Sequence, residues 1–98
     1  MNISFEKEHM TAISSSHIPM GFIDFPQVRP GLVNITQVRV SPQFRGQGVE
    51  DIMMEALLNH LSQQDRKAAL SSPFAQQYVG KHPEWKHILP EKIHFTRH

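Results

Sequence analysis

The residue types with a chemical role gather in one short stretch, residues 38–49, which reads VRVSPQFRGQGV. Alternating apolar residues indicate a strand that breaks at Ser41-Pro42, and Gly46 and Gly48 come directly before an amphipathic segment. A helix N-terminus presents unpaired N–H groups and a partial positive charge, so a phosphate can bind there without a dedicated side chain. Arg45 adds a cation, and the glycines permit close approach. The stretch indicates a pyrophosphate-binding loop or, alternatively, an ordinary strand-to-helix turn that needs glycine for its dihedral angles.

The residues around these glycines resemble the GNAT superfamily of N-acetyltransferases, whose loop carries Arg or Gln, two residues, Gly, one residue, then Gly or Ala. More narrowly, the chain is similar to the very small single-domain GNAT-like acetyltransferases. In those proteins a Cys-Pro-Phe helix start, a Tyr and a His-Pro-Glu-aromatic element follow the loop. The resemblance covers about residues 32–89. The matching elements here are Arg45-Gly46-Gln47-Gly48-Val49, Ser72-Pro73-Phe74, Tyr78 and His82-Pro83-Glu84-Trp85.

The resemblance implies an acetyl-CoA-dependent N-acetyltransferase that transfers an acetyl group to an unidentified amine by direct attack. Tyr78 is then the candidate proton donor to the leaving thiolate, or else a half-buried aromatic that packs with Phe74. Ser72 occupies the place of the family's cysteine as a second catalytic candidate, although a serine is far less nucleophilic and a helix N-cap role explains it fully. The strand residues are assigned to the pantetheine arm and the loop to the pyrophosphate. The expected cofactor-binding residues are Val38, Arg39, Val40, Arg45, Gly46, Gln47, Gly48 and Val49.

Four positions depart from the family pattern. Glu50 stands where the loop normally has Gly or Ala, Gln37 and Val38 stand where the small family has His-Thr, and Ser72 replaces a cysteine. Every reactive side chain of the motif except the tyrosine is therefore replaced. Two alternatives follow, namely a GNAT-like protein that binds CoA or another ligand with little or no catalysis, and an interaction module that has lost the cofactor site.

The elements that must position these residues form an α/β (α+β) domain, GNAT-like, with a mostly antiparallel sheet of about five strands and two main helices. Residues 26–31 contain two prolines and a glycine and are expected to form a surface connection. The alternation of residues in the predicted strand before the loop neither requires nor excludes a bulge near Thr36. The predicted strands are Asn2–Phe5, Met10–Ser15, Ile18–Phe25, Leu32–Val40 and Lys67–Leu70.

Two helices are expected, over Gln47–Gln64 and Pro73–Val79. The second begins with Ser72 as N-cap and Pro73 at its first position. His60 falls within the apolar stripe of the first helix and is interpreted as a histidine at the boundary of the core. The stripe predicted to pack on the sheet consists of Val49, Ile52, Met53, Ala56, Leu57, His60 and Leu61.

Composition limits the other possibilities. The 98 residues suggest one domain, 1–98, with a loosely held tail over 90–98. Ten Lys and Arg oppose nine Asp and Glu, which is not the basic surface of a nucleic-acid-binding protein. Without cysteine, and without a zinc-type pair among the seven histidines, no metal site is expected. No apolar run reaches membrane-spanning length and no signal peptide is recognised, so we expect a cytoplasmic monomer.

Overall fold

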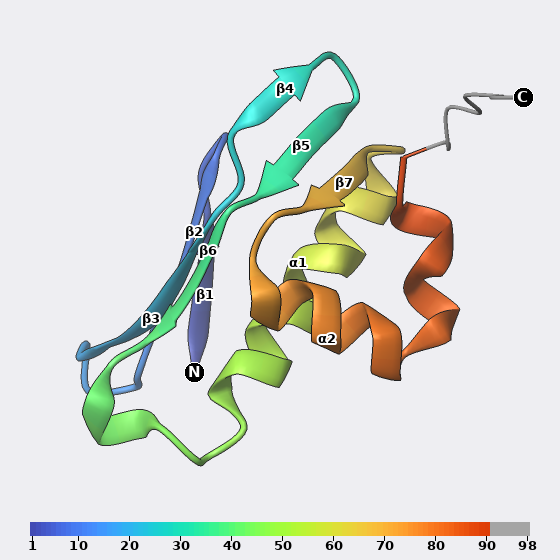
Figure 1. Cartoon of the computed structure of the whole chain (residues 1–98). Helices are drawn as coiled ribbons and strands as arrows, with labels where there is room; N and C mark the ends of the chain where they lie inside the picture. Colours follow the sequence, from blue (N-terminus) through green and yellow to red (C-terminus); the bar gives the residue numbers. More distant parts are fainter. Residues whose placement is uncertain (91–98) are drawn as a thin grey trace, which may run out of the picture.

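The computed structural model describes residues 1–90, so only Pro90 of the predicted tail lies within the described residues. Figure 1 shows the strands on one side and the two α-helices on the other. The elements are β1 (Asn2–Phe5), β2 (His9–Ile13), β3 (Pro19–Asp24), β4 (Gln27–Arg29), β5 (Leu32–Ile35), β6 (Gln37–Val40), the 3-10 turn η1 (Pro42–Phe44), α1 (Val49–Gln63), β7 (Lys67–Leu70), α2 (Pro73–Lys81) and the 3-10 turn η2 (Pro83–Ile88).

The strands form two sheets. β1, β2, β3 and β6 make an antiparallel sheet in that order, and β4, β5 and β7 make a smaller one in which β5 and β7 are parallel. The predicted α/β class, with a mostly antiparallel sheet and two main helices, is confirmed. Seven strands are present among the described residues, whereas about five were predicted.

One of the additional strands arises because the predicted strand Leu32–Val40 is divided at Thr36. The Thr36 N–H donates to the carbonyl oxygen of Asp24 at 3.0 Å, and its hydroxyl donates to the same oxygen at 3.4 Å. The sequence left open whether the strand is irregular near Thr36, and the structure shows that it is interrupted there. Before it, β5 pairs with β7, and after it β6 pairs with β3. The two halves of one extended segment therefore belong to different sheets.

The other additional strand is β4, which lies in the segment predicted to be a surface connection. All three of its residues are exposed, and it pairs with β5 through a turn at Gly31, where φ is +82°. Proline is compatible with this strand because Pro26 and Pro30 flank it and need not donate to its ladder. The segment is on the surface, as predicted, but it is paired.

The α1 helix begins at Val49 and ends at Gln63, slightly inside the predicted limits. Ile52 was predicted to face the core, but this residue is 49% exposed, so the prediction was wrong at this position. Met54 and Leu58 are fully buried instead. Because α1 contacts the sheets, α2 and η2, its buried face is wider than a single-sided stripe. The buried residues of α1 are Val49, Met53, Met54, Leu57, Leu58 and Leu61.

Two contacts fix α1 on the larger sheet. A side chain at Gly21 on β3 would clash with the Arg39 backbone oxygen of β6 and would meet the Met53 Cε atom of α1 at 3.1 Å, so glycine here permits the approach of β6 and leaves room for Met53. The His60 ring stacks on Phe5 with 3.8 Å between ring centroids. Burial, followed by the charge of Arg66, lowers the pKa of His60. These contacts agree with the interpretation of His60 as a packing residue.

Within residues 1–90, no helix is both long and apolar enough to cross a bilayer. In the same residues, His, Asp and Glu side chains do not form any group of three that could hold a metal ion.

Candidate functional site

The glycine-rich loop between η1 and α1 lies at the lower end of the sheet in Figure 1. Gly46 and Gly48 both have φ of +78°, and a Cβ added at either would meet no atom within 4 Å. Gly48 is the N-cap of α1. The left-handed backbone explains why glycine is favoured at both positions, and the surrounding open space leaves the backbone accessible to a ligand.

The amides of this loop are available for hydrogen bonding. The Arg45 N–H donates to the Pro42 carbonyl at 3.3 Å, and the Ile52 N–H donates to the Gly48 carbonyl at 3.2 Å. Within residues 1–90, the N–H groups of Gly46, Gln47 and Gly48 have no acceptor. Exposed donors at a helix N-terminus form an anion site.

Charged side chains flank these amides. Arg45 is exposed beside the first glycine, while Glu50 is half-buried and Asp51 exposed in the first turn of α1. Acidic residues at that position stabilise a helix by interacting with its dipole. Their charges also oppose an anion at the same helix end, and the loop therefore combines one cation, two carboxylates and a set of unpaired backbone donors.

β6 leads directly into this loop and has an open edge. The Ser41 N–H donates to the Met20 carbonyl, and the Arg39 carbonyl lies against Gly21. Because hydrogen-bonded pairs alternate along an antiparallel ladder, the N–H and C=O groups of Arg39 face β3, and those of Val38 and Val40 face away from it. Among the described strands, β6 pairs only with β3. Val38 and Val40 therefore offer backbone donors and acceptors to a ligand.

A groove of about 200 Å³ separates this open edge from the start of α2. It exists because β6 turns toward β3 after the irregularity at Thr36, whereas β7 stays with β5 and ends at Leu70. The exposed side chains of Gln37 and Arg39 border the groove, and the Arg39 Nε donates to the Gln37 amide oxygen at 3.4 Å. The lining residues are Thr36, Gln37, Val38, Arg39, Ser72, Pro73 and Phe74.

Ser72 lies at the inner end of this groove and is 3% exposed. Its hydroxyl oxygen accepts from the Ala75 N–H at 3.2 Å, which caps α2, and its own N–H donates to the Ile35 carbonyl at 2.9 Å. The second bond holds the start of α2 against the end of β5. The predicted cap is present, and the geometry gives this hydroxyl a structural partner.

Tyr78 lies one helical turn beyond Phe74 and is 5% exposed. Its ring stacks on His82, with 4.1 Å between centroids, and makes a tilted contact with Phe74 at 6.3 Å. Burial raises the pKa of the Tyr78 phenol above its usual 10.0, and the carboxylates of Glu55, Asp51 and Glu84 add smaller contributions. The phenol therefore keeps its proton at neutral pH.

The Tyr78 ring borders a second, smaller hollow of about 90 Å³ between α2 and the first turn of α1. Phe74 lines both this hollow and the groove beside β6. Phe74 thus places the groove beside β6 next to the hollow at the first turn of α1. The residues around the smaller hollow are Asp51, Phe74, Gln77, Tyr78, Lys81 and His82.

One pair of side chains escaped the sequence analysis. His9 Nδ1 and Asp24 Oδ1 lie 2.6 Å apart on β2 and β3, and their side chains are 37% and 35% exposed. The residues are 15 positions apart, so only the register of the two strands brings them together. The alternation of residues along each strand could have placed His9 and Asp24 on one face or the other of the sheet. That they are partners could be seen only from the register of the two strands in the structure.

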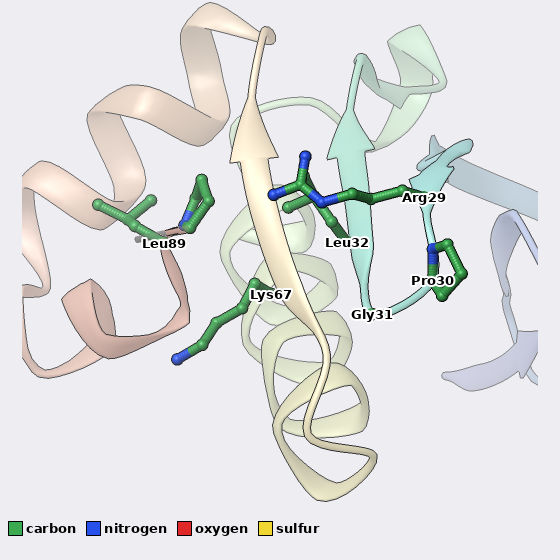
Figure 2. A pocket seen from close by; sticks show the side chains of 7 residues that line it. Arg29, Pro30, Gly31, Leu32, Lys67 and Leu89 are labelled. Atoms are coloured by element: carbon green, nitrogen blue, oxygen red, sulfur yellow. The ribbon is translucent and has the colours of Figure 1, made fainter. Parts of the chain in front are cut away.

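A larger hollow, about 450 Å³, lies at the opposite end of β5 and β7 from the glycine loop. Figure 2 shows Arg29 extending across Leu32 toward β7, with Lys67 at the start of that strand. The Lys67 ammonium donates to the His87 carbonyl. This hollow contains no residue of the predicted site, and its position separates it from the open edge of β6.

Comparison with known proteins identifies the class of this architecture. The GCN5-related N-acetyl-transferase family model matches residues 10–88. No curated protein matches the chain. A GCN5-like candidate N-acetyltransferase from Staphylococcus aureus, solved by NMR, has a TM-score of 0.73 at 21% identity, covering 99% of this chain and 95% of the other.

Two larger structures share the fold. Tetrahymena GCN5 has a TM-score of 0.63 at 18% identity, covering 90% of this chain and 64% of that protein. Rv2747 from Mycobacterium tuberculosis, solved in complex with CoA, has the same TM-score and identity, covering 79% of this chain and 48% of that protein. The chain therefore shares its fold with these structures. The chain belongs to the GCN5-related N-acetyltransferase family.

Proposed function

We propose that this protein is an acetyl-CoA-dependent N-acetyltransferase that transfers the acetyl group to an amine by direct attack. The proposal rests on the order of two binding elements along residues 38–49, the open edge of β6 and then the glycine loop. The open edge of β6 ends at Val40, and the unpaired amides of the loop begin at Gly46. Donors for an extended amide-bearing arm and for a diphosphate are therefore arranged in the order in which CoA carries those groups.

The backbone of β6 and the loop have distinct roles in this proposal. Val38 and Val40 bind the amide groups of the pantetheine arm through their N–H and C=O groups, because those of Arg39 are used by β3. The amides of Gly46 through Val49 bind the pyrophosphate, and Arg45 contributes a cation at the mouth of the loop. Of the predicted β6 residues, Arg39 acts through its side chain, which borders the groove.

Acetyl-CoA, when bound, supplies the activated thioester carbonyl. The chain then has to hold a proton for the leaving sulfur, and Tyr78 is the candidate because its raised pKa keeps the phenol protonated at neutral pH. Ser72 remains a candidate by its position in the groove, but its hydroxyl oxygen accepts a capping hydrogen bond. Direct attack by the amine requires no enzyme nucleophile, so the cap can be kept throughout the reaction.

A second candidate function is CoA binding with little or no catalysis. It is favoured by the absence of an ionisable side chain at position 37, where the small family has histidine, and by the carboxylate of Glu50 beside the loop. Both proposals require the loop and the open edge of β6. They differ only in whether the thioester is consumed.

Thermal unfolding with and without CoA and acetyl-CoA tests the shared part of both proposals. A ligand at a hundred times its dissociation constant stabilises the folded state by about 2.7 kcal/mol. For a domain of this size, that corresponds to an increase in Tm of roughly 10 to 20 °C. Thiol release from acetyl-CoA with a panel of amines then distinguishes the transferase proposal from CoA binding without catalysis. An unchanged Tm at millimolar CoA would refute both.

A further inference from the structure

The face of the larger sheet that points away from α1 carries a row of polar side chains. Cross-strand partners share a face, so the register places His9, Asp24 and Gln37 side by side on β2, β3 and β6. Their neighbours Met10, Ile23 and Val38 take the other face, and Met10 and Ile23 are fully buried. Gln37 also lines the groove beside β6. The row therefore leads from the groove to the His9–Asp24 pair.

The pair has unused hydrogen-bonding capacity. Asp24 binds His9 through Oδ1 at 2.6 Å, which leaves Oδ2 as an acceptor. When His9 donates from Nδ1, its Nε2 atom is a free basic nitrogen. The Phe22 ring stacks on the imidazole with 5.3 Å between centroids and limits its motion. A carboxylate and an oriented imidazole at about one-third exposure form a small polar site beside an aromatic wall.

The local charges favour a cation as the occupant. The nearest basic side chain along β6 is Arg39, which lies opposite Phe22 and donates to Gln37 rather than to Asp24. Glu8, next to His9 in sequence, accepts from the Gln27 N–H and adds a second carboxylate near this end of the sheet. A primary alkylammonium offers three donors and one positive charge, which matches these acceptors.

We infer that His9 and Asp24 form the acceptor site for a cationic primary amine, with Gln37 between this site and the groove. This inference rests on the proposed function. Asp24 binds the ammonium, and His9 Nε2 takes one of its protons to leave a neutral amine. The nitrogen then bonds to the acetyl carbonyl carbon as the C–S bond breaks, Tyr78 gives its proton to the thiolate, and a second nitrogen proton restores the Tyr78 phenol. The products are the amide, the thiol and one proton on His9, which returns to solvent.

The binding test uses n-butylamine hydrochloride as the probe and n-butanol as a neutral analogue of similar shape. In protein saturated with CoA, the ring proton signals of His9, identified by their loss in His9→Gln, are followed by NMR during each titration. Butylammonium shifts these signals in wild type and fails to do so in Asp24→Asn, whereas butanol has no effect. Equal shifts with amine and alcohol, or none with amine, overturn the inference.

Kinetics provide the second readout. Asp24→Asn keeps an oxygen that can accept from His9, so we expect the fold to be retained, and melting verifies this. Losing one charged hydrogen bond raises KM for butylamine by about tenfold to a hundredfold and leaves KM for acetyl-CoA unchanged. His9→Gln lowers kcat. Asp65→Asn is the matched control, because it removes one exposed carboxylate at the far end of α1, where φ is +56° and asparagine is tolerated.

The outcomes separate this inference from the proposed function. If CoA binds and butylammonium shifts His9 but no amide forms, the acceptor site is supported and the catalytic proposal fails. If butylamine is acetylated with the same KM by wild type and Asp24→Asn, the transferase proposal is supported and the acceptor site is refuted.

Discussion

A pair of substitutions at Gly48 isolates the electrostatic contribution of the loop to CoA binding. Gly48 has φ of +78° and open space around its missing Cβ, so a new side chain meets backbone strain but no clash. Asparagine and aspartate tolerate this conformation better than other residues and have nearly the same shape. Gly48→Asn and Gly48→Asp therefore share the strain and differ in one negative charge.

The size of the difference follows from Coulomb's law. Two unit charges 4 Å apart interact by about 1 kcal/mol in water and about 4 kcal/mol at an effective dielectric constant of 20, which correspond to roughly fivefold and nearly a thousandfold in affinity. The loop is exposed, so we expect the lower part of this range. Gly48→Asp should bind CoA about five- to fiftyfold more weakly than Gly48→Asn, and the difference should shrink with added salt.

Isothermal titration with CoA measures both variants, and melting without ligand verifies that they are equally folded. Gly31→Asp is the positional control, because Gly31 also has a positive φ and open surroundings but lies in the β4–β5 turn at the opposite end of the small sheet. It should bind CoA like wild type. Equal CoA affinities for Gly48→Asn and Gly48→Asp would refute the assignment of the pyrophosphate to this loop.

Four further predictions concern single residues. Glu50→Ala should leave CoA affinity within about twofold by titration, because a half-exposed glutamate can turn away, while unfolding experiments show a loss of about 0.3–1 kcal/mol from the helix dipole; a large gain in affinity would identify Glu50 as a brake. Ser72→Ala should lower the unfolding free energy by about 1 kcal/mol through loss of the cap and retain thiol release, whereas complete loss of turnover in folded protein would make Ser72 a nucleophile. The raised pKa of Tyr78 means that its neutral form stabilises the fold, so stability should fall as pH rises past 10.0, and urea titrations should show a smaller fall in Tyr78→Phe. Gly21→Ala should cost about 1–3 kcal/mol in denaturation because its methyl group meets the Arg39 backbone; an unchanged midpoint would contradict the close approach of β6 to Gly21 on β3.

The sequence was most informative where the signals are local. The Ser72-Pro73 helix start, the glycine loop before α1 and the strand Lys67–Leu70 depend on capping, dihedral angles and short-range alternation, and each occurs as predicted. Such features are determined within a few residues of themselves. The order of elements, and with it the fold class, could therefore be predicted.

Features that depend on distant partners could not be predicted. The division of Leu32–Val40 requires Asp24 as the acceptor for Thr36, and simple alternation is compatible with a continuous strand. Ile52 is exposed and Met54 is buried because α2 and η2 cover part of α1, which no helical period reveals. The open edge of β6 follows from the same division, so the sequence identified the candidate cofactor-binding segment but not which of its backbone groups are free.

The most direct test of the account is the response of the backbone amides to CoA. In two-dimensional 15N–1H spectra of the labelled protein, titration with CoA should shift the amides of Gly46, Gln47, Gly48 and Val49 together with those of Val38 and Val40. The Arg39 amide, which faces β3, should shift less. Shifts confined to the hollow around Arg29 and Lys67, or no shifts at millimolar CoA, would contradict the proposed site.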